Sequence, residues 1–353
     1  MKRWTLCIAC GLLAFMVALA GCSTLLPQAA SPTAEPAAPP ITVRVETPTV
    51  PAPPVEETAA PSIPAETIEP LPIIVEDRVL NILLLGSDQR QGESGPWRTD
   101  VIMWVTIHRD TKQVGILSIP RDLWVSIPKV GENRINVADY YGETLKYPGG
   151  GPALVADTLK NNLGLETDRY IRLNFEAFEQ VIDAMGGVTV QVDCPVEDNF
   201  IDPTYPGGLR PLRVSAGTQV MDGKTALMFA RSRHGRGDID RTRRQQRVLM
   251  GIRDRALDVE MIPRIPRIWV SLKKSVDTDL SLQEILSLAL LAKDISADQI
   301  HSRVMDYTML RDWTTPAGAM VLLPDRAKVK DAIEHLMDSP PLMESSRYPG
   351  TCP

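Results

Sequence analysis

Histidine and cysteine are scarce in this chain, and their scarcity excludes one common class of site. The 353 residues include four histidines and five cysteines, with no cluster at the spacing of metal ligands, so a zinc site is not expected. The chain also has no excess of basic residues, because its net charge is −6. The overall charge therefore does not indicate nucleic-acid binding. With 44% apolar and 23% charged residues, the chain can still bury a sizeable core.

The N-terminus is typical of an export signal, with a positively charged start and an uncharged, mainly apolar stretch from 4 to 20. It ends in Leu19-Ala20-Gly21-Cys22, which resembles the lipobox of bacterial lipoproteins. We therefore expect residues 1–22 to be a signal peptide with lipidation at Cys22. A stretch of this length is near the lower limit for a membrane span, so an uncleaved anchor stays open. Both alternatives place the chain outside the cytoplasm and anchor it to the cell membrane.

The segment 23–78 is expected to be a disordered linker. It holds 13 of the 30 prolines and eight acidic residues but no lysine, a composition that favours extended chain and buries little apolar surface. A folded domain is expected over 79–340, followed by a tail at 341–353. Cys194 and Cys352 lie beyond the signal. Two thiols in an oxidising compartment either pair, which would tie the tail to the domain, or stay free.

Apolar runs, helical spacing and glycine stops divide the domain into elements. Strands are expected at 79–85, 101–107, 114–119, 170–173 and 188–192. Helices are expected at 152–163, 175–185, 223–230, 241–257, 263–273, 282–293 and 325–337. Strands mixed with helices throughout indicate an α/β sandwich around one sheet.

Charged residues stand at the ends of the first three expected strands. Asp88 follows the first, Arg98 and Asp100 open the second, and Arg121 follows the third. Ligands gather at the carboxyl ends of strands in α/β sheets, and we expect a parallel neighbour to bring Asp100 near Asp88. Two carboxylates that share a cation with phosphate oxygens suit Mg²⁺. The plainer alternatives are an aspartate solvated in a turn and a surface salt bridge between Arg121 and Asp122.

An arginine run is the strongest single signal. Residues 231–255 contain nine arginines, three acids and no lysine. Arginine presents a planar fork of donors that grips phosphate at two points, so its exclusive use indicates phosphate recognition. On a helix beginning near Arg241, that residue, Arg244 and Gln245 share a face, with Arg231 and Arg233 in the segment before it. The alternative is a solvated basic helix, and we expect the rest of the run to lie on the helix surface.

Six sequence blocks, taken in order, resemble the LytR–CpsA–Psr family of cell-wall enzymes. They are NILLLGSDQR, WRTDVIMWVTI, GILSIPRDLWVSIP, RINVADYYG, DRYIRLNFEAFEQVIDAMGGVTVQV and MDGKTALMFARSRHGRGDIDRTRRQQ. The resemblance implies an α-β-α sandwich around a central mixed sheet, with an apolar pocket for a polyprenyl chain. It also implies transfer of a glycopolymer phosphate from an undecaprenyl-pyrophosphate carrier to peptidoglycan, as in a teichoic acid transferase, with Mg²⁺ or Mn²⁺ at the pyrophosphate.

Roles for single residues follow from the same resemblance. Asp88 and Asp100 would bind the metal, and Asp238 would orient arginines. The pyrophosphate would be held by Arg98, Arg121, Arg231, Arg233 and Arg241, with Gln245 beside them. The catalytic set would be Asp88, Asp100, Arg121, Arg231 and Arg233, and either carboxylate could take the proton of the attacking sugar hydroxyl.

Other functions fit the same residues. One is a polyprenyl-pyrophosphate pyrophosphatase, and another is a non-catalytic protein that binds a lipid pyrophosphate as sensor or carrier. A regulator of transcription is disfavoured, because the export signal places the domain outside the cytoplasm. The identity of the polymer, the acceptor position and the oligomeric state stay open.

Overall fold

The structure is a computed structural model that describes residues 78–89, 96–233, 237–258, 261, 265–273, 275–348 and 350–352. The expected signal peptide, the lipidation site Cys22 and nearly all of the expected linker lie outside these residues. In the part of the chain that is described, no helix has the length and apolar character needed to cross a membrane.

A six-stranded mixed sheet forms the centre of the domain, in the order β11-β6-β1-β2-β3-β12. β1 pairs parallel with β6 and antiparallel with β2, and β3 pairs antiparallel with β2 and parallel with β12. The strands are β1 Val79–Ser87, β2 Thr99–His108, β3 Gln113–Ile119, β6 Arg169–Asn174, β11 Asp277–Thr278 and β12 Ile300–Val304. The first two are buried over almost their whole length, as expected for strands covered on both faces.

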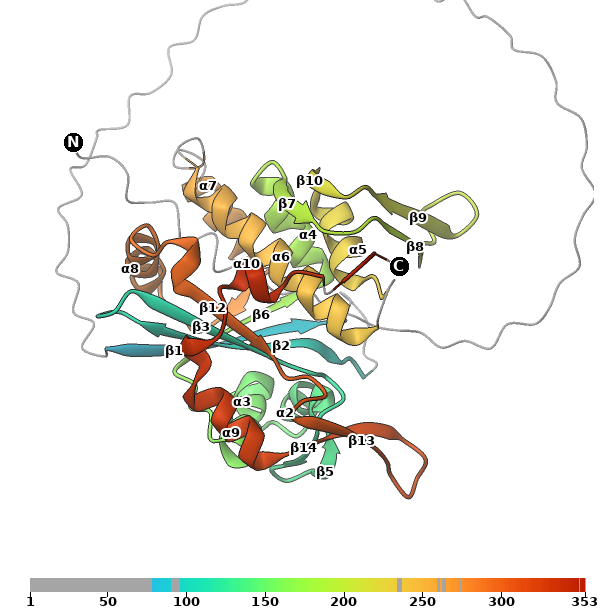
Figure 1. Cartoon of the computed structure of the whole chain (residues 1–353), viewed down its shortest axis with the longest axis vertical. Coiled ribbons are helices and arrows are strands. Elements are labelled where there is room, and N and C mark those ends of the chain that lie inside the picture. The colour runs from blue at the N-terminus through green and yellow to red at the C-terminus, as the bar shows by residue number, and fades with distance from the viewer. Residues whose placement is uncertain are drawn as a thin grey trace, which may run out of the picture. The chain divides into compact units, whose positions relative to one another are not determined.

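Helices cover both faces of this sheet, so the expected α-β-α sandwich with a mixed sheet is confirmed (Figure 1). On one face lie α4 Phe175–Ala184, α5 Gly223–Arg231, α6 Asp238–Leu257 and α7 Ile265–Leu272. On the other lie α2 Ala138–Thr144, α3 Gly150–Leu163 and α9 Arg326–Glu334. The remaining helices are α8 Leu282–Ala292 and the short α10 Leu342–Ser345.

Four two-stranded sheets lie outside the central sheet, and the sequence indicated only one of their strands. They pair β4 Trp124–Ile127 with β5 Gly131–Arg134, β7 Val188–Val192 with β10 Gly217–Met221, β8 Val196–Ile201 with β9 Leu209–Val214, and β13 Leu310–Thr314 with β14 Met320–Pro324. The expected helix ends agree within a few residues. Gly164, for example, ends α3 with a φ of 74°, a conformation that glycine adopts without strain.

Candidate active site

Charged residues from four segments meet at one edge of the sheet. β1 and β2 are antiparallel, as are β2 and β3, so the end of β1, the start of β2 and the end of β3 share that edge. Asp100 and Arg121 line one hollow there together with Asp238 and Arg241 from the first turn of α6. Our expectation that a parallel strand brings Asp100 toward Asp88 was wrong, because a parallel neighbour would begin at the opposite edge.

Asp100 is a buried carboxylate, with 3% of the residue exposed. Its Oδ2 accepts a hydrogen bond from Arg121 Nη1 at 2.9 Å, whereas its Oδ1 is buried and has no hydrogen-bond partner. Burial raises the pKa of Asp100, and the positive charges of Arg121 and Arg241 act in the opposite direction. A buried carboxylate oxygen without a partner is costly, so it marks a position where a cation or donor would stabilise the site.

Asp88 supplies a second carboxylate next to the first. Its Oδ1 accepts a hydrogen bond from the backbone N–H of Arg98 at 2.5 Å. Burial raises the pKa of Asp88, and the charge of Asp100 raises it further. Burial is thus the main reason why the pKa of each carboxylate is raised.

These two carboxylates fit Mg²⁺ better than an all-protein metal cage. Among the described residues, no group of three or more His, Cys, Asp or Glu side chains could hold a metal ion. Mg²⁺ does not need such a group, because it keeps several waters and binds through one or two carboxylates plus phosphate oxygens. The buried, unpartnered Oδ1 of Asp100 is the observation that favours a cation here.

Arg241 is the central cation of the site and is only 1% exposed. Its Nη2 lies 2.6 Å and 2.8 Å from the two carboxylate oxygens of Asp238. Its Nε and Nη1 are buried and have no hydrogen-bond partner. Burial lowers the pKa of Arg241 to about 10, and the like charges of Arg121 and Arg233 lower it further. A buried guanidinium with two unused donors beside a hollow is an anion receptor.

The other expected ligands surround this centre. Arg98 and Arg233 are exposed, and Arg233 Nε lies 3.7 Å from Asp238 Oδ1. Gln245 is buried, lines the hollow, and its Nε2 lies 3.4 Å from the carbonyl oxygen of Ala230. Five of the predicted site residues therefore line this hollow: Asp100, Arg121, Asp238, Arg241 and Gln245.

Two aromatic rings position the side chain of Arg231. It is the last residue of α5, and its guanidinium lies 4.3 Å from the ring centroid of Phe175 and 5.3 Å from that of Phe200. Such cation–π contacts fix the direction of a long side chain. Its role at the pyrophosphate stays a prediction.

The expectation that the rest of the arginine run lies on the helix surface was wrong for two residues. Arg244 and Arg247 are 8% and 5% exposed, so they do not lie on the helix surface. Arg244 donates to the carbonyl oxygen of Ser232, and Arg247 Nη2 lies 3.0 Å from Asp193 Oδ2. Both guanidinium groups hold neighbouring segments against α6.

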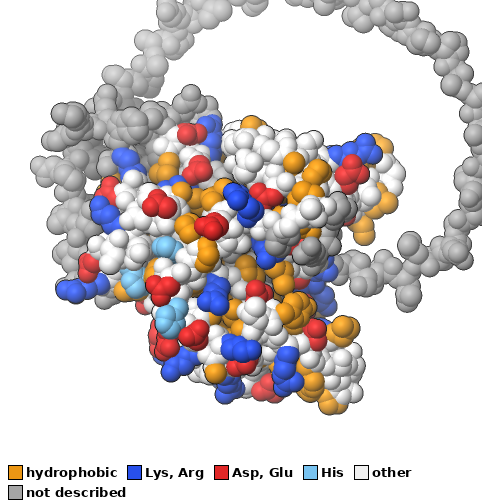
Figure 2. Space-filling view, in the orientation of Figure 1, with side chains coloured by type: hydrophobic (Ala, Val, Ile, Leu, Met, Phe, Trp, Pro, Cys, Tyr) orange, Lys and Arg blue, Asp and Glu red, His pale blue; other side chains and the backbone are white. Residues whose placement is uncertain are grey.

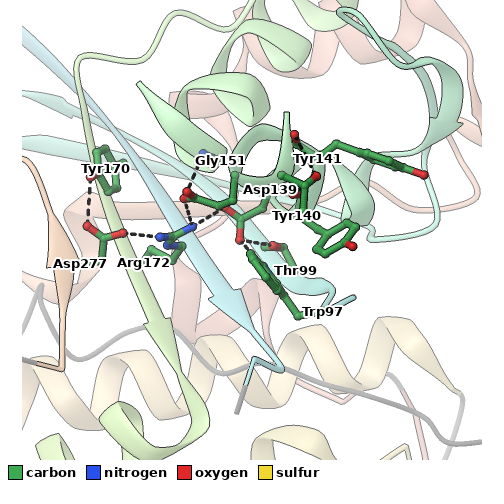
Figure 3. A network of polar contacts seen from close by, with 11 residues as sticks. Trp97, Thr99, Asp139, Tyr140, Tyr141, Gly151, Tyr170, Arg172 and Asp277 are labelled. Carbon is green, nitrogen blue, oxygen red and sulfur yellow. Dashed lines mark hydrogen bonds and ion pairs between the residues drawn. The ribbon is translucent and has the colours of Figure 1, made fainter. Parts of the chain in front are cut away.

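Asp139 organises the segment between the two carboxylates, and the sequence did not single it out. It is fully buried, and its Oδ2 accepts hydrogen bonds from Trp97 Nε1 at 3.0 Å and Thr99 Oγ1 at 3.1 Å (Figure 3). Its Oδ1 binds Arg172 Nη1 at 2.8 Å. Trp97 and Thr99 flank Arg98, so Asp139 fixes the backbone that carries Arg98 and Asp100. Its only sequence signal was its place in the block RINVADYYG.

Arg172 in turn holds three carboxylates of the same network. Besides Asp139 it binds Glu143 Oε1 at 2.7 Å and Asp277 Oδ2 at 2.6 Å (Figure 3). These acids come from α2 and β11, whereas Arg172 lies on β6. One guanidinium therefore joins the sheet to α2 beneath the candidate site.

Comparison with known proteins identifies the family. The family model described as the LytR_cpsA_psr family matches residues 56–337. The chain belongs to the LytR–CpsA–Psr family. It is 36% identical over 215 residues to the polyisoprenyl-teichoic acid–peptidoglycan teichoic acid transferase TagU of Oceanobacillus iheyensis, covering 60% of this chain and 62% of that protein. It is 31% identical over 210 residues to the regulatory protein MsrR of Staphylococcus aureus strain COL, covering 59% and 58%.

Solved structures of similar fold agree with this assignment. The crystal structure of B. subtilis TagV matches with a TM-score of 0.59 and 25% identity, covering 76% of this chain and all of that one. A structure of TagT bound to LI-WTA matches with a TM-score of 0.57 and 26% identity, covering 74% of this chain and 90% of that one. The resemblance inferred from the six blocks is confirmed.

A small apolar cavity lies behind the LytR–CpsA–Psr candidate site. It measures about 80 Å³ and lies between four strands of the sheet and helices α6 and α8. Leu84, Val105, Leu249 and Leu288 are among its lining residues, and Arg253 is its one charged member. Its size is small for the polyprenyl chain whose pocket the family resemblance implies, so that pocket stays a prediction.

A disulfide ties the C-terminus of this family member to its domain. Cys194 and Cys352 are joined, with a Cα–Cα distance of 5.4 Å. Beside them, Asp193 Oδ2 accepts a hydrogen bond from the backbone N–H of Tyr348 at 2.8 Å and pairs with Arg247 of α6. The tail is thus fastened to the helix whose first turn carries Arg241.

Proposed function

We propose that the chain is a phosphotransferase that moves a glycopolymer phosphate from an undecaprenyl-pyrophosphate carrier to peptidoglycan. The observation that carries this proposal is Arg241, a buried guanidinium with two unused donors beside the Asp100–Arg121 pair. Phosphoryl transfer needs mainly positioning and neutralisation of charge on the phosphate oxygens. A site with converging arginines, one buried carboxylate and one half-buried carboxylate offers both. The family membership and the names of the relatives support the same reading.

In this proposal the arginines bind the pyrophosphate. Arg241 donates hydrogen bonds to the phosphate oxygens from Nε and Nη1. Arg121, whose side chain is held by its bond to Asp100, adds a second positive charge beside them. The hollow itself is narrow, about 10 Å³, so the pyrophosphate lies across its mouth, where Arg98 and Arg233 are exposed. Asp88 and Asp100 would hold Mg²⁺ or Mn²⁺, which supplies charge neutralisation at the phosphate oxygens.

The reaction exchanges one phosphorus–oxygen bond for another. The sugar hydroxyl of the acceptor attacks the phosphorus that carries the glycopolymer. The bond from that phosphorus to the bridging oxygen breaks, and undecaprenyl monophosphate leaves with that oxygen. The hydroxyl proton passes to a carboxylate, for which Asp88 and Asp100 are the candidates.

The remaining parts of the proposal concern the membrane. Cys22 carries the lipid that anchors the chain outside the cytoplasm, and the proline-rich segment spans the distance to the domain. The isoprenoid chain enters the apolar cavity beside α8, which then has to move away from the sheet to enlarge that cavity. Cys22→Ser is expected to release the protein from the membrane fraction and to abolish its labelling with radioactive palmitate.

The direct test supplies the purified chain with Mg²⁺ and a polyprenyl-pyrophosphate sugar and measures release of the lipid monophosphate. Arg121→Ala and Arg231→Ala are expected to lose activity by about 10²–10³-fold, the usual effect of removing one charge-stabilising contact. Arg326→Ala, an exposed arginine of α9, is the matched control. Full activity in both site variants would contradict the proposal, and full biological function of Asp88→Ala would favour a non-catalytic binding protein.

A further inference from the structure

The candidate site and a larger cavity each share lining residues with one small hollow. This hollow shares Pro120, Asp238 and Thr242 with the candidate site. The same hollow shares Val304 and Asp306 with a cavity of about 430 Å³ on the far side of the α6 N-terminus. The three spaces are therefore neighbours in a row, and we call the cavity together with the connecting hollow the α6–β12 cleft.

The cavity has unused hydrogen-bonding groups. Ser339 is 7% exposed, and its Oγ is buried with no hydrogen-bond partner. Arg243 pairs through Nη1 with Asp240 Oδ1 at 2.9 Å, whereas its Nε is buried without a partner. Arg303 also lines the cavity and makes no ion pair with any residue that the structure describes. The volume of the cavity lies in the range of roughly 300–1,000 Å³ that is usual for ligand sites.

A chain of buried polar side chains joins the wall of this cavity to the candidate site. Gln246, which is fully buried, donates from Nε2 to Ser118 Oγ at 3.0 Å. Its Oε1 lies 3.4 Å from Ser302 Oγ, and that hydroxyl lies 2.5 Å from Ser345 Oγ. Ser118 lines the candidate site, and Ser302 and Ser345 line the cavity. Such a satisfied network fixes the two spaces relative to each other.

The charge pattern selects the class of ligand. Besides Arg243 and Arg303, the cavity is lined by the carboxylates Asp306 and Asp338 and by His335. On the face shown in Figure 2, basic, acidic and histidine side chains of the described residues are intermixed, without a continuous patch of one charge. A polyanion would meet two carboxylates there, whereas sugar hydroxyls both donate to carboxylates and accept from arginines.

We propose that the α6–β12 cleft binds a stretch of the acceptor glycan and directs one of its hydroxyl groups toward the candidate pyrophosphate site. Tyr307, which is 62% exposed and lines the connecting hollow, supplies an apolar ring face for a sugar between the two spaces. This inference rests on the proposed transferase function and gives that function its acceptor subsite.

Binding of a soluble glycan tests the cleft without any need for turnover. The probe is chitotetraose, a β-1,4-linked tetramer of N-acetylglucosamine, titrated into the full chain in detergent by calorimetry. Arg303→Ala is expected to weaken binding by at least tenfold, and Arg326→Ala, on an exposed face of α9, is expected to leave it unchanged. Equal affinity of Arg303→Ala and wild type would overturn the proposal, as would preferential binding of poly(glycerol phosphate).

Turnover then separates this inference from the proposed function. With a peptidoglycan acceptor, Arg303→Ala is expected to raise the acceptor KM about tenfold at unchanged kcat. Release of lipid monophosphate to water alone should stay at the wild-type rate. A drop in that hydrolysis would assign Arg303 to the pyrophosphate site and overturn the cleft. If wild type releases no lipid monophosphate at all, the proposed function fails, while the chitotetraose titration still decides the cleft.

Discussion

Arg241 gives a prediction in which stability and ligand binding change in opposite directions. Its pKa falls to about 10 in the folded protein from an ordinary value of 12.5. At about 1.4 kcal/mol per pKa unit, burying this charge destabilises the folded chain by about 3 kcal/mol. Arg241→Met removes that charge and fills similar volume. Asp238 loses its partner, but its side chain is 36% exposed and its charge stays partly solvated. The variant is therefore expected to be as stable as wild type or more stable by up to about 3 kcal/mol.

The sign of the pH dependence follows from the direction of the shift. A base whose folded pKa is lowered destabilises the fold at every pH below that pKa. The penalty disappears only as the pH rises through about 10 toward 12.5. The stability difference between Arg241→Met and wild type should accordingly stay constant from pH 6 to pH 9, as measured by urea unfolding.

The ligand response is the second half of this prediction. Methylenediphosphonate with Mg²⁺ at 100 times its dissociation constant should stabilise wild type by about 2.7 kcal/mol. Arg241→Met loses hydrogen bonds between charged groups worth roughly 1.5–3 kcal/mol, so the same ligand concentration should stabilise the variant by only about 0.3–1.3 kcal/mol. Arg244→Met is the matched control, because burial also lowers the pKa of Arg244 to about 10 but this residue does not line the hollow.

Two results would refute the reasoning. One is a wild-type thermal shift with the diphosphonate in Arg241→Met. The other is a loss of about 3 kcal/mol or more in the ligand-free variant, which would show that the guanidinium stabilises the fold.

Three further predictions concern the supports of the site. Asp139→Asn should lower the free energy of unfolding by about 1–3 kcal/mol and raise the Mg²⁺ concentration needed for half-maximal activity; an unchanged Mg²⁺ dependence would contradict its positioning role. Gly151→Ala should destabilise by about 1–3 kcal/mol, because a Cβ would lie 2.0 Å from Asp139 Oδ1; a normal melting temperature would show that α2 and α3 can separate. Cys352→Ser should lower stability by about 2–4 kcal/mol, since the bond closes a loop with a sequence separation of 158. Dithiothreitol should reproduce that loss in wild type and leave the variant unaffected.

Local sequence signals predicted the elements better than their pairing. The run from Val79 to Leu85 indicated a buried strand, and the structure contains it. Its neighbours could not be derived in the same way, because strand direction depends on contacts between distant segments. β12 pairs parallel with β3 across more than 180 residues, and no periodicity within either strand specifies that partner.

The candidate site was predictable where charge stood at strand ends. Asp100 and Arg121 were singled out on that ground, and they form an ion pair at 2.9 Å. Asp139 was missed because its importance lies in what it contacts: Trp97 and Thr99 come from a segment about 40 residues earlier. A buried aspartate in a helix has no composition signal that separates it from an exposed one.

The arginine run shows why composition alone overestimates a binding site. The sequence could not separate Arg241 from Arg244, because both are arginines on one helix close to the same loop. The fold separates them by what satisfies their donors. Arg244 donates to the carbonyl oxygen of Ser232 and so completes the chain's own backbone, whereas Arg241 keeps two buried nitrogens without a hydrogen bond. Burying an unused donor is costly, and Nη1 of Arg241 is the one terminal guanidinium nitrogen of the described arginines that is buried without a hydrogen bond. That nitrogen, rather than the number of arginines, marks the candidate phosphate site.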